Sequence, residues 1–161
     1  MNRFDNEIRI TPSVLDRLID YEPEISHELV ASRAKSLRQL KQAVRRDLEY
    51  LLNTRQLATG VPAGLKELNK SLAVYGLPDF SAINVNSPEE QTRLRRLLEK
   101  TIGFFEPRLK GVKVTLEPVQ GAERALRFRV DARLQVEPTP EPVTFDTVLQ
   151  LHSGEYRVRG E

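Results

Sequence analysis

A charged pair straddles a proline within residues 104–109, Phe-Phe-Glu-Pro-Arg-Leu. Pro107 fixes its own φ and disfavours helical geometry at Glu106, so both charges should be held in defined directions. Arg108 offers a planar fork for a carboxylate or a carbonyl oxygen, and Glu106 offers the complementary acceptor. The residues alone favour a local salt bridge at a helix end and a partner-binding site equally.

Glycoside hydrolysis is the enzymatic reaction that two carboxylates alone could support, provided that apolar surroundings keep one of them protonated. Glu106 follows two phenylalanines and is the one acid with such an apolar approach. Arg108, however, favours the ionised carboxylate, and no second carboxylate can be named as its partner. A lysozyme-like peptidoglycan glycosidase therefore stands as an alternative function rather than the first.

Other reactive groups are sparse. The chain has no cysteine, which excludes disulfides and thiolate metal ligands. The two histidines, His27 and His152, lie far apart without a partner at ligand spacing, and no glycine-rich phosphate-binding motif occurs. The sequence predicts a non-enzymatic protein with no catalytic residue, metal, cofactor or small-molecule substrate.

Basic residues gather in two clusters, although the formal net charge is only +2. The clusters contain Arg33, Lys35, Arg38, Lys41, Arg45 and Arg46, and then Arg93, Arg95, Arg96 and Lys100. Such clusters can face nucleic acid, an anionic membrane or an acidic protein, but a solvated helix face is favoured. A nucleic-acid-binding adaptor is the third candidate function. Aromatic residues make up only 6% of the chain and none interrupts the first cluster, so no nucleic acid is expected as a partner.

The N-terminal part of the chain shows helical spacing. Residues 1–35 are predicted to form a partly flexible arm with a short amphipathic piece at 13–19, and residues 36–161 a single domain. Leucines and valines at helical spacing predict a helix over residues 36–54, with the basic residues off its apolar stripe. A loop over residues 55–70 and a short helical turn at 71–75 should follow.

A second long helix is predicted from Ser87 to Pro107. Ser87 should cap it with its side chain, Pro88 suits the first helical position, and Glu90 can close a capping box. Pro107 then ends the helix.

After Pro107 the apolar residues alternate strictly with polar ones, which predicts strands at 112–116, 126–136 and 143–151 and a short fourth at 156–158. Helices first and strands afterwards predict an α+β fold. Its N-terminal helices should pack on one face of a small, mainly antiparallel C-terminal β-sheet. A sheet this small leaves exposed edges.

Five segments, in this order, resemble the TssE family of type VI secretion, which is related to the small wedge protein of contractile-phage baseplates. They are residues 13–18 with 22–23, residues 36–55, residues 75–80, residues 106–109, and residues 145–147 with 154–156. The resemblance covers nearly the whole chain. It implies a structural subunit of the baseplate wedge, and the residues give no support to the lysozyme label that phage relatives have carried.

The resemblance also implies partners. These are the wedge proteins TssF and TssG, with TssK and the base of the spike and tube as further candidates. In the family the Glu-Pro-Arg element is implicated in holding the subunit to the wedge bundle. Glu106 and Arg108 are therefore the expected contacts, and Pro107 is expected to fix the backbone geometry between them.

A sheath contact is implied by the likeness of the family's fold to the interlocking part of the sheath subunits, TssB and TssC. Exposed edges of the C-terminal sheet would accept sheath strands and so start polymerisation of the sheath. Arg127, Arg129 and Arg133 lie on one face of the strand predicted over 126–136. That basic stripe is expected to select an acidic sheath partner.

Localisation follows from two absences in the sequence. Residues 1–7 hold no apolar run of the signal-peptide kind, and no stretch of about 18 apolar residues could span a membrane. We therefore expect a cytoplasmic protein that assembles on the baseplate at the cytoplasmic side of the inner membrane.

Overall fold

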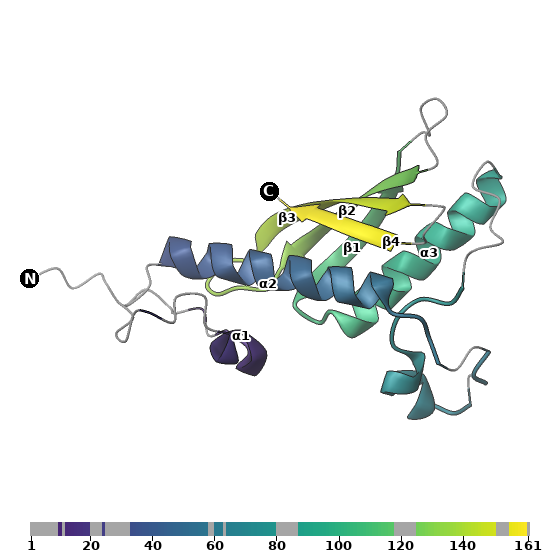
Figure 1. The fold of residues 1–161 in the computed structure, drawn as a ribbon, viewed down its shortest axis with the longest axis horizontal. Coiled ribbons are helices and arrows are strands. Elements are labelled where there is room, and N and C mark those ends of the chain that lie inside the picture. The colour runs from purple at the N-terminus through teal and green to yellow at the C-terminus, as the bar shows by residue number, and fades with distance from the viewer. Residues whose placement is uncertain are drawn as a thin grey trace, which may run out of the picture.

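The computed structural model describes residues 10, 12–19, 24, 33–57, 60–62, 64–79, 87–117, 125–150 and 155–160. Helices come first along the chain and strands follow, which confirms the predicted α+β class (Figure 1). The helices are α1 (Val14–Leu18), α2 (Arg33–Asn53), the 3-10 turns η1 (Leu68–Lys70) and η2 (Leu72–Val74), and α3 (Pro88–Phe105). The strands are β1 (Leu109–Leu116), β2 (Ala125–Leu134), β3 (Glu141–Gln150) and β4 (Glu155–Gly160).

The four strands form one antiparallel sheet in the order β1-β2-β3-β4, so each strand pairs with its neighbour in sequence. The register places Val130 opposite Phe145 and Leu149 opposite Tyr156. In this order β1 and β4 are the two edge strands. Such a meander needs only short connections between consecutive strands.

Alternation along the strands gives the sheet one covered face and one exposed face. The buried face of β2 carries Leu126, Phe128, Val130, Ala132 and Leu134, and the intervening arginines are exposed. The helices cover that face from its two ends, with α2 packed against β4 and α3 packed against β1. One helical face and one sheet face thus close a single core.

The two long helices bury the stripes that the sequence predicts, with small differences. The buried residues are Ala43, Val44, Leu48, Leu51 and Leu52 in α2, and Leu94, Leu98, Thr101 and Ile102 in α3. Leu37 and Leu40, near the start of α2, are only partly buried against the core. No helix among the described residues is long and apolar enough to cross a membrane.

Strand β1 begins three residues earlier than the alternation predicts. Gly111 has a φ of 64°, and the pairing with β2 shifts register between Lys110 and Lys113. This irregularity inserts residues that break the apolar alternation. The alternation in the sequence therefore does not predict where the strand begins. Strands β2, β3 and β4 lie within a few residues of their predicted positions.

The start of α3 differs from the prediction in its cap. Pro88 occupies the first turn as predicted, but the side chain of Ser87 makes no capping hydrogen bond. Glu90 lies within 3.9 Å of Arg93, one turn further along the helix, instead of returning to Ser87. The predicted capping box is therefore wrong. Glu90 pairs with Arg93 instead, and both acids of the first turn interact favourably with the helix dipole.

Candidate functional site

The Glu-Pro-Arg element lies where α3 gives way to β1. Glu106 has a non-helical backbone (φ −117°, ψ 79°), and its N–H donates the last helical bond to the carbonyl of Ile102 at 2.8 Å. The N–H of Leu109 donates to the carbonyl of Glu106 at 3.1 Å, and the N–H of Gln135 donates to the carbonyl of Arg108 at 2.8 Å. Main-chain bonds on both sides thus fix the directions of the two charged side chains.

Glu106 and Arg108 form a bidentate ion pair with each other. The Nε of Arg108 donates to Oε1 of Glu106 at 2.6 Å, and its Nη2 donates to Oε2 at 2.5 Å. The main-chain N–H of Arg108 also approaches Oε1 at 3.3 Å. Glu106 is only 5% exposed, so most of its carboxylate is engaged inside the protein. The local salt bridge that the residues suggested is therefore present.

The pair is part of a longer chain of alternating charges that reaches two helices. The same Nη2 of Arg108 contacts Oδ2 of Asp47 at 2.6 Å. Arg46 donates to Oδ1 of Asp47 at 2.8 and 3.0 Å, and to Oδ1 of Asp16 at 2.8 Å. We call Asp16, Arg46, Asp47, Glu106 and Arg108 the ion network. It ties α1 and α2 to the junction between α3 and β1.

Both arginines of the ion network are held in the charged state. The hydrogen bonds to Glu106 raise the pKa of Arg108 against the opposing effect of burial, and Asp47 adds to the rise. Burial acts to lower the pKa of Arg46, but the hydrogen bonds to Asp47 and Asp16 outweigh it, so the pKa rises. Guanidinium groups held in this state fix the geometry of the ion network through charge-assisted hydrogen bonds.

An aromatic cluster borders the ion network. The ring of Tyr75 meets Phe105 edge to face with centroids 5.1 Å apart, and Phe105 meets Phe104 in the same way at 4.8 Å. Burial raises the pKa of the Tyr75 hydroxyl, and the negative charges of Asp47 and Glu106 raise it further. Phe104 is 46% exposed, which leaves an aromatic surface beside the Glu-Pro-Arg element.

The segment that carries Tyr75 is held against the end of α2 by hydrogen bonds. The N–H of Leu77 donates to the carbonyl of Thr54 at 2.8 Å, and the N–H of Gln56 donates to the carbonyl of Leu77 at 3.0 Å. The side chain of Gln56 donates to two further carbonyls of this segment, at 3.0 and 3.1 Å. Gly76 has a φ of 96°, and a Cβ there would lie 2.2 Å from the Thr54 oxygen. Only glycine permits this approach.

Solvent reaches the ion network unevenly. The Glu106 side chain is 6% exposed, whereas those of Arg108 and Asp47 are 26% and 27% exposed. Pro107 is exposed. A partner could therefore contact Pro107 and the outer edge of the Arg108–Asp47 pair, while Glu106 orients Arg108 from inside.

The second predicted set, the arginines of β2, lies on the exposed face of the sheet and not beside the ion network. Arg127, Arg129 and Arg133 are all exposed, as the alternation predicts. Arg129 donates to Asp146 at 3.0 Å and lies 3.5 Å from Glu117, and the hydrogen bond to Asp146 raises its pKa. Neighbouring strands thus partly neutralise the basic stripe.

Sequence reasoning named Glu106 and Arg108 but missed three members of the ion network. Asp47 is the first acid after the basic cluster of α2, which was the one available signal. Its partners lie far away in the chain, since Arg108 and Asp47 are 61 residues apart. No period or motif reports such a contact.

Metal binding finds no support in the part of the chain that the structure describes. Those residues contain no group of three or more His, Asp or Glu side chains that could hold an ion. His27 and His152 lie outside the described residues.

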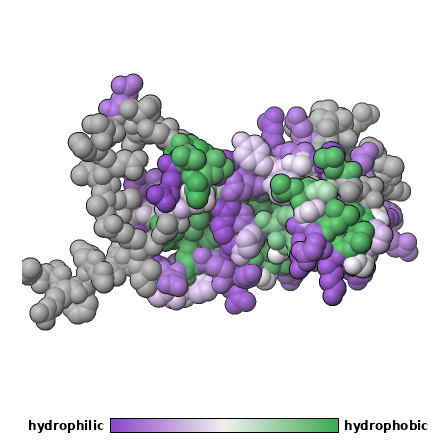
Figure 2. Space-filling model, turned by 90° about the horizontal axis from the view of Figure 1, so that it is seen from below, coloured by the Kyte–Doolittle hydropathy of each residue, from purple (hydrophilic) through white to green (hydrophobic). Residues whose placement is uncertain are grey.

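The face seen in Figure 2 carries apolar patches separated by hydrophilic side chains. Exposed apolar residues of the described chain include Val14, Leu15 and Leu18 of α1, and Leu57 and Leu72 of the segment after α2. These side chains leave apolar surface exposed at α1 and in the segment after α2.

Comparison with known proteins gave one family, and the solved structures that match include two of limited similarity. A chain described as part of the baseplate complex from the type VI secretion system is 23% identical with a TM-score of 0.49, and the match covers 70% of this chain and 96% of that one. A protein from Geobacter sulfurreducens described as a candidate tail lysozyme is 17% identical with a TM-score of 0.44, over 74% of this chain and 94% of that one. Neither likeness is close enough to carry an argument, and no curated protein matches the sequence.

The family match extends over most of the described domain. The model of the family described as baseplate wedge protein gp25 matches residues 38–139, which include most of α2, all of α3, β1 and β2, and the Glu-Pro-Arg element. More than half of the chain lies within this range. The chain therefore belongs to the baseplate wedge protein gp25 family.

Proposed function

We propose that this protein is a structural, non-enzymatic subunit of the type VI secretion baseplate, joining the wedge complex to the contractile sheath. The observation that carries the proposal is the family match over residues 38–139. The family is one of structural baseplate proteins, which agrees with a role without catalysis. The glycosidase alternative gains no support, because the carboxylate of Glu106 is engaged by Arg108 through two hydrogen bonds.

The wedge contact in this proposal uses the outer surface of the ion network. TssF and TssG would meet Pro107 and the exposed edge of Arg108, with Phe104 beside them. Glu106 contributes by holding Arg108 in one orientation, since it is itself buried. Charged groups that are already fixed lose little freedom on binding, and this preorganisation favours affinity.

The sheath contact in this proposal uses the sheet. Strands β1 and β4 are its edges, and strands from TssB and TssC would add to an edge and template the first ring of the sheath. Arg127 and Arg133, together with Arg129 and its partner Asp146, would select among acidic surfaces. TssK and the base of the spike and tube complete the proposed neighbours, at the cytoplasmic side of the inner membrane.

The test is capture of TssF and TssG by the tagged full-length protein. We expect Arg108→Ala to abolish capture, and Arg108→Lys to weaken it strongly because an ammonium group cannot replace the fork. Removing Arg108 also leaves Glu106 without its partner, which should reduce the free energy of unfolding by about 3 kcal/mol. Urea denaturation must therefore establish that each variant is folded under the assay conditions.

The matched control is Arg95→Ala, which removes an exposed arginine from α3. It should leave capture unchanged. Failure of the wild-type protein to capture either partner would overturn the proposed function. Normal capture by folded Arg108→Ala would leave the wedge assignment standing and remove the role given to the Glu-Pro-Arg element.

A further inference from the structure

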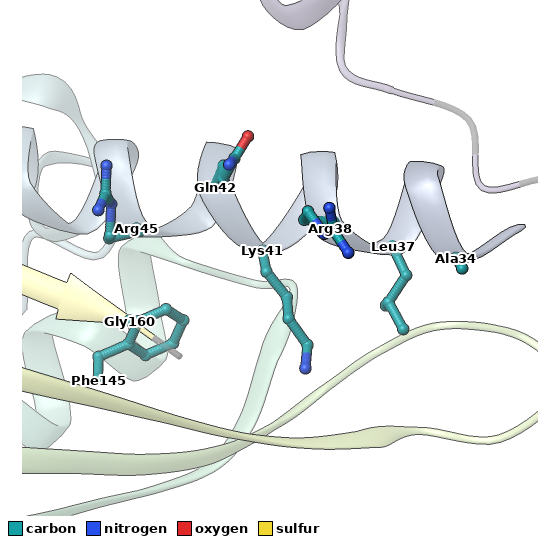
Figure 3. Close-up of a pocket in the computed structure, with 8 residues that line it drawn as sticks. All are labelled: Ala34, Leu37, Arg38, Lys41, Gln42, Arg45, Phe145 and Gly160. Carbon is teal, nitrogen blue, oxygen red and sulfur yellow. The ribbon is translucent and has the colours of Figure 1, made fainter. Parts of the chain in front are cut away.

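Helix α2 carries charges of opposite sign on two of its sides. On one side a groove lies between α2 and strands β3 and β4 (Figure 3). The described residues that line this groove include Arg38, Lys41 and Arg45 and no acid. Figure 3 shows Lys41 extending from the helix toward the strands. On another side of α2 lies the ion network, in which acids outnumber arginines. The two sides therefore suit binding groups of opposite charge.

Arg108 has one nitrogen left for a partner. Its Nε donates to Glu106, and its Nη2 donates to Glu106 and Asp47, which uses every donor on these two nitrogens. No atom of the described residues accepts a hydrogen bond from Nη1. The buried polar side-chain atoms without a partner in the described part of the chain are Thr147 Oγ1 and the Tyr156 hydroxyl, so Nη1 is open to solvent. A partner therefore meets Nη1 alone, because the forked face of the guanidinium group is already occupied.

Asp47 has acceptor capacity left next to this arginine. Its Oδ1 accepts two bonds from Arg46, whereas its Oδ2 accepts one bond, from Arg108. Each carboxylate oxygen has two lone pairs, so Oδ2 can accept from one more donor. The Asp47 side chain is 27% exposed, and that donor can therefore come from a partner. The Arg108–Asp47 pair thus offers one free donor group and one free acceptor site close together.

The charge around the Arg108–Asp47 pair is negative. The ion network holds three acids and two arginines, so its net charge is −1. Burial raises the pKa of the Tyr75 hydroxyl, and the negative charges of Asp47 and Glu106 raise it further, as a negative potential requires. A second carboxylate brought to Arg108 would be repelled by this charge, whereas a cation brought to Asp47 would be attracted. A carbonyl oxygen has no net charge and is therefore the acceptor that suits Nη1 of Arg108.

We propose that the outer edge of the Arg108–Asp47 pair binds a basic side chain of a partner protein together with a neighbouring main-chain carbonyl group. The lysine or arginine of the partner pairs with Oδ2 of Asp47, and the carbonyl oxygen accepts from Nη1 of Arg108. Asp47 is therefore a binding residue as well as a support for Arg108. The inference rests on the proposed function, because it takes TssF or TssG as the protein that meets this edge. It adds the chemical class of the group that binds.

The last turn of a helix offers both of these groups. Its final carbonyl oxygens have no helical partner, and basic side chains are favoured there because they interact with the helix dipole. Phe104 is 46% exposed beside the Glu-Pro-Arg element and can cover an apolar side chain of the same turn. An acidic segment finds no such match at this edge, since the cations without acids around them lie in the groove on the other side of α2.

The test measures the Kd of the purified TssF–TssG complex for the immobilised full-length protein at several salt concentrations. Asp47→Asn keeps the size of the side chain, and its amide oxygen can still accept from Arg46, but the negative charge is removed. We expect Kd to rise by roughly fivefold. We also expect Kd to depend less on salt than it does for wild type, because one attraction between opposite charges is lost. A purely structural role of Asp47 would leave the salt dependence unchanged.

The matched control is Glu89→Gln, which makes the same change of charge at an exposed position in the first turn of α3, at the opposite end of that helix from Glu106. It should leave Kd and its salt dependence unchanged. Urea denaturation establishes that each variant is folded. Asp47→Glu keeps the charge and provides the same test if Asp47→Asn does not fold, since it should retain the salt dependence of wild type.

Three results would overturn the inference. Tighter binding by Asp47→Asn would mean that the partner brings an acid to Arg108. An unchanged salt dependence in Asp47→Asn would mean that Asp47 only orients Arg108, and loss of the salt dependence in Asp47→Glu would mean that the charge of Asp47 is not what the partner meets. Each of these results leaves the proposed function standing, because that function falls only if the wild-type protein captures neither TssF nor TssG.

Discussion

The side-chain amide of Asn53 forms two hydrogen bonds with the main chain of Tyr156, and both are 2.8 Å long. The Nδ2 of Asn53 donates to the carbonyl of Tyr156, and the N–H of Tyr156 donates to Oδ1 of Asn53. The amide thus occupies the groups that a neighbouring strand would use, and it closes the first part of the β4 edge. It also joins the end of α2 to the last described strand.

Replacing Asn53 should show how much this contact stabilises the fold. Asn53→Ala leaves two main-chain groups of β4 without their partner, which should lower the free energy of unfolding by about 2 kcal/mol. Asn53→Asp keeps the acceptor and loses the donor, so it should retain part of that stability. Urea denaturation with an unchanged slope would measure the loss. A change below about 0.3 kcal/mol in the alanine variant would mean that solvent replaces the amide fully.

Gly76→Ala should be strongly destabilising. The φ of 96° disfavours any Cβ, and the new atom would meet the Thr54 oxygen at 2.2 Å. We expect a loss of roughly 3 kcal/mol. The control is Gly103→Ala within α3, where a Cβ meets nothing within 4 Å. That variant should be more stable than wild type by about 0.5–1 kcal/mol, and thermal unfolding of both proteins would check the opposite signs.

The stability that the Asp16–Arg46 ion pair between α1 and α2 contributes should depend on pH, because Asp16 titrates. Burial acts to raise the pKa of this carboxyl, but the hydrogen bonds from Ser13 and Arg46 outweigh it and lower the pKa below its usual 3.8. A depressed folded-state pKa contributes stability above the unfolded value, and that stability is lost as the pH falls through the folded value. Wild type should therefore be more stable than Asp16→Asn at neutral pH. The difference should shrink as the pH falls below 3.8.

Tyr156→Phe should not destabilise the protein. The Tyr156 hydroxyl is buried without a hydrogen-bond partner among the described residues, and burial raises its pKa to about 12. Removing a hydroxyl of this kind should stabilise the fold by about 1 kcal/mol, because an unsatisfied polar group is removed while the ring remains. Tyr50→Phe, at a ring that is 62% exposed, is the neutral control. A loss above about 1 kcal/mol in Tyr156→Phe would indicate a hydrogen bond to water.

The sequence predicts those parts of the fold that depend on local spacing. The stripe from Val44 to Leu52 and the alternation from Leu126 to Leu134 report which faces are buried, since each period belongs to one element. Pro107 likewise ends α3 and fixes the direction of its neighbours through local geometry.

The rest depends on contacts between distant residues. Asp47 meets Arg108 across 61 residues, and Asn53 meets Tyr156 across 103. The relative placement of α2 and the sheet decides which of the basic residues of α2 enter the ion network and which line the groove. A single sequence carries no signal for that placement, so Arg46 and Arg45 look alike before folding.

The packing of α2 against β4 also sets an order of events during synthesis. The ribosome makes α2 first and β4 last among the described elements, and the buried stripe of α2 has no sheet edge to cover until β4 has emerged. Until then Val44, Leu48 and Leu52 remain exposed on the nascent chain, where they are a target for chaperones. The core between α2 and the sheet therefore closes only when β4, the last of the described strands, has been made.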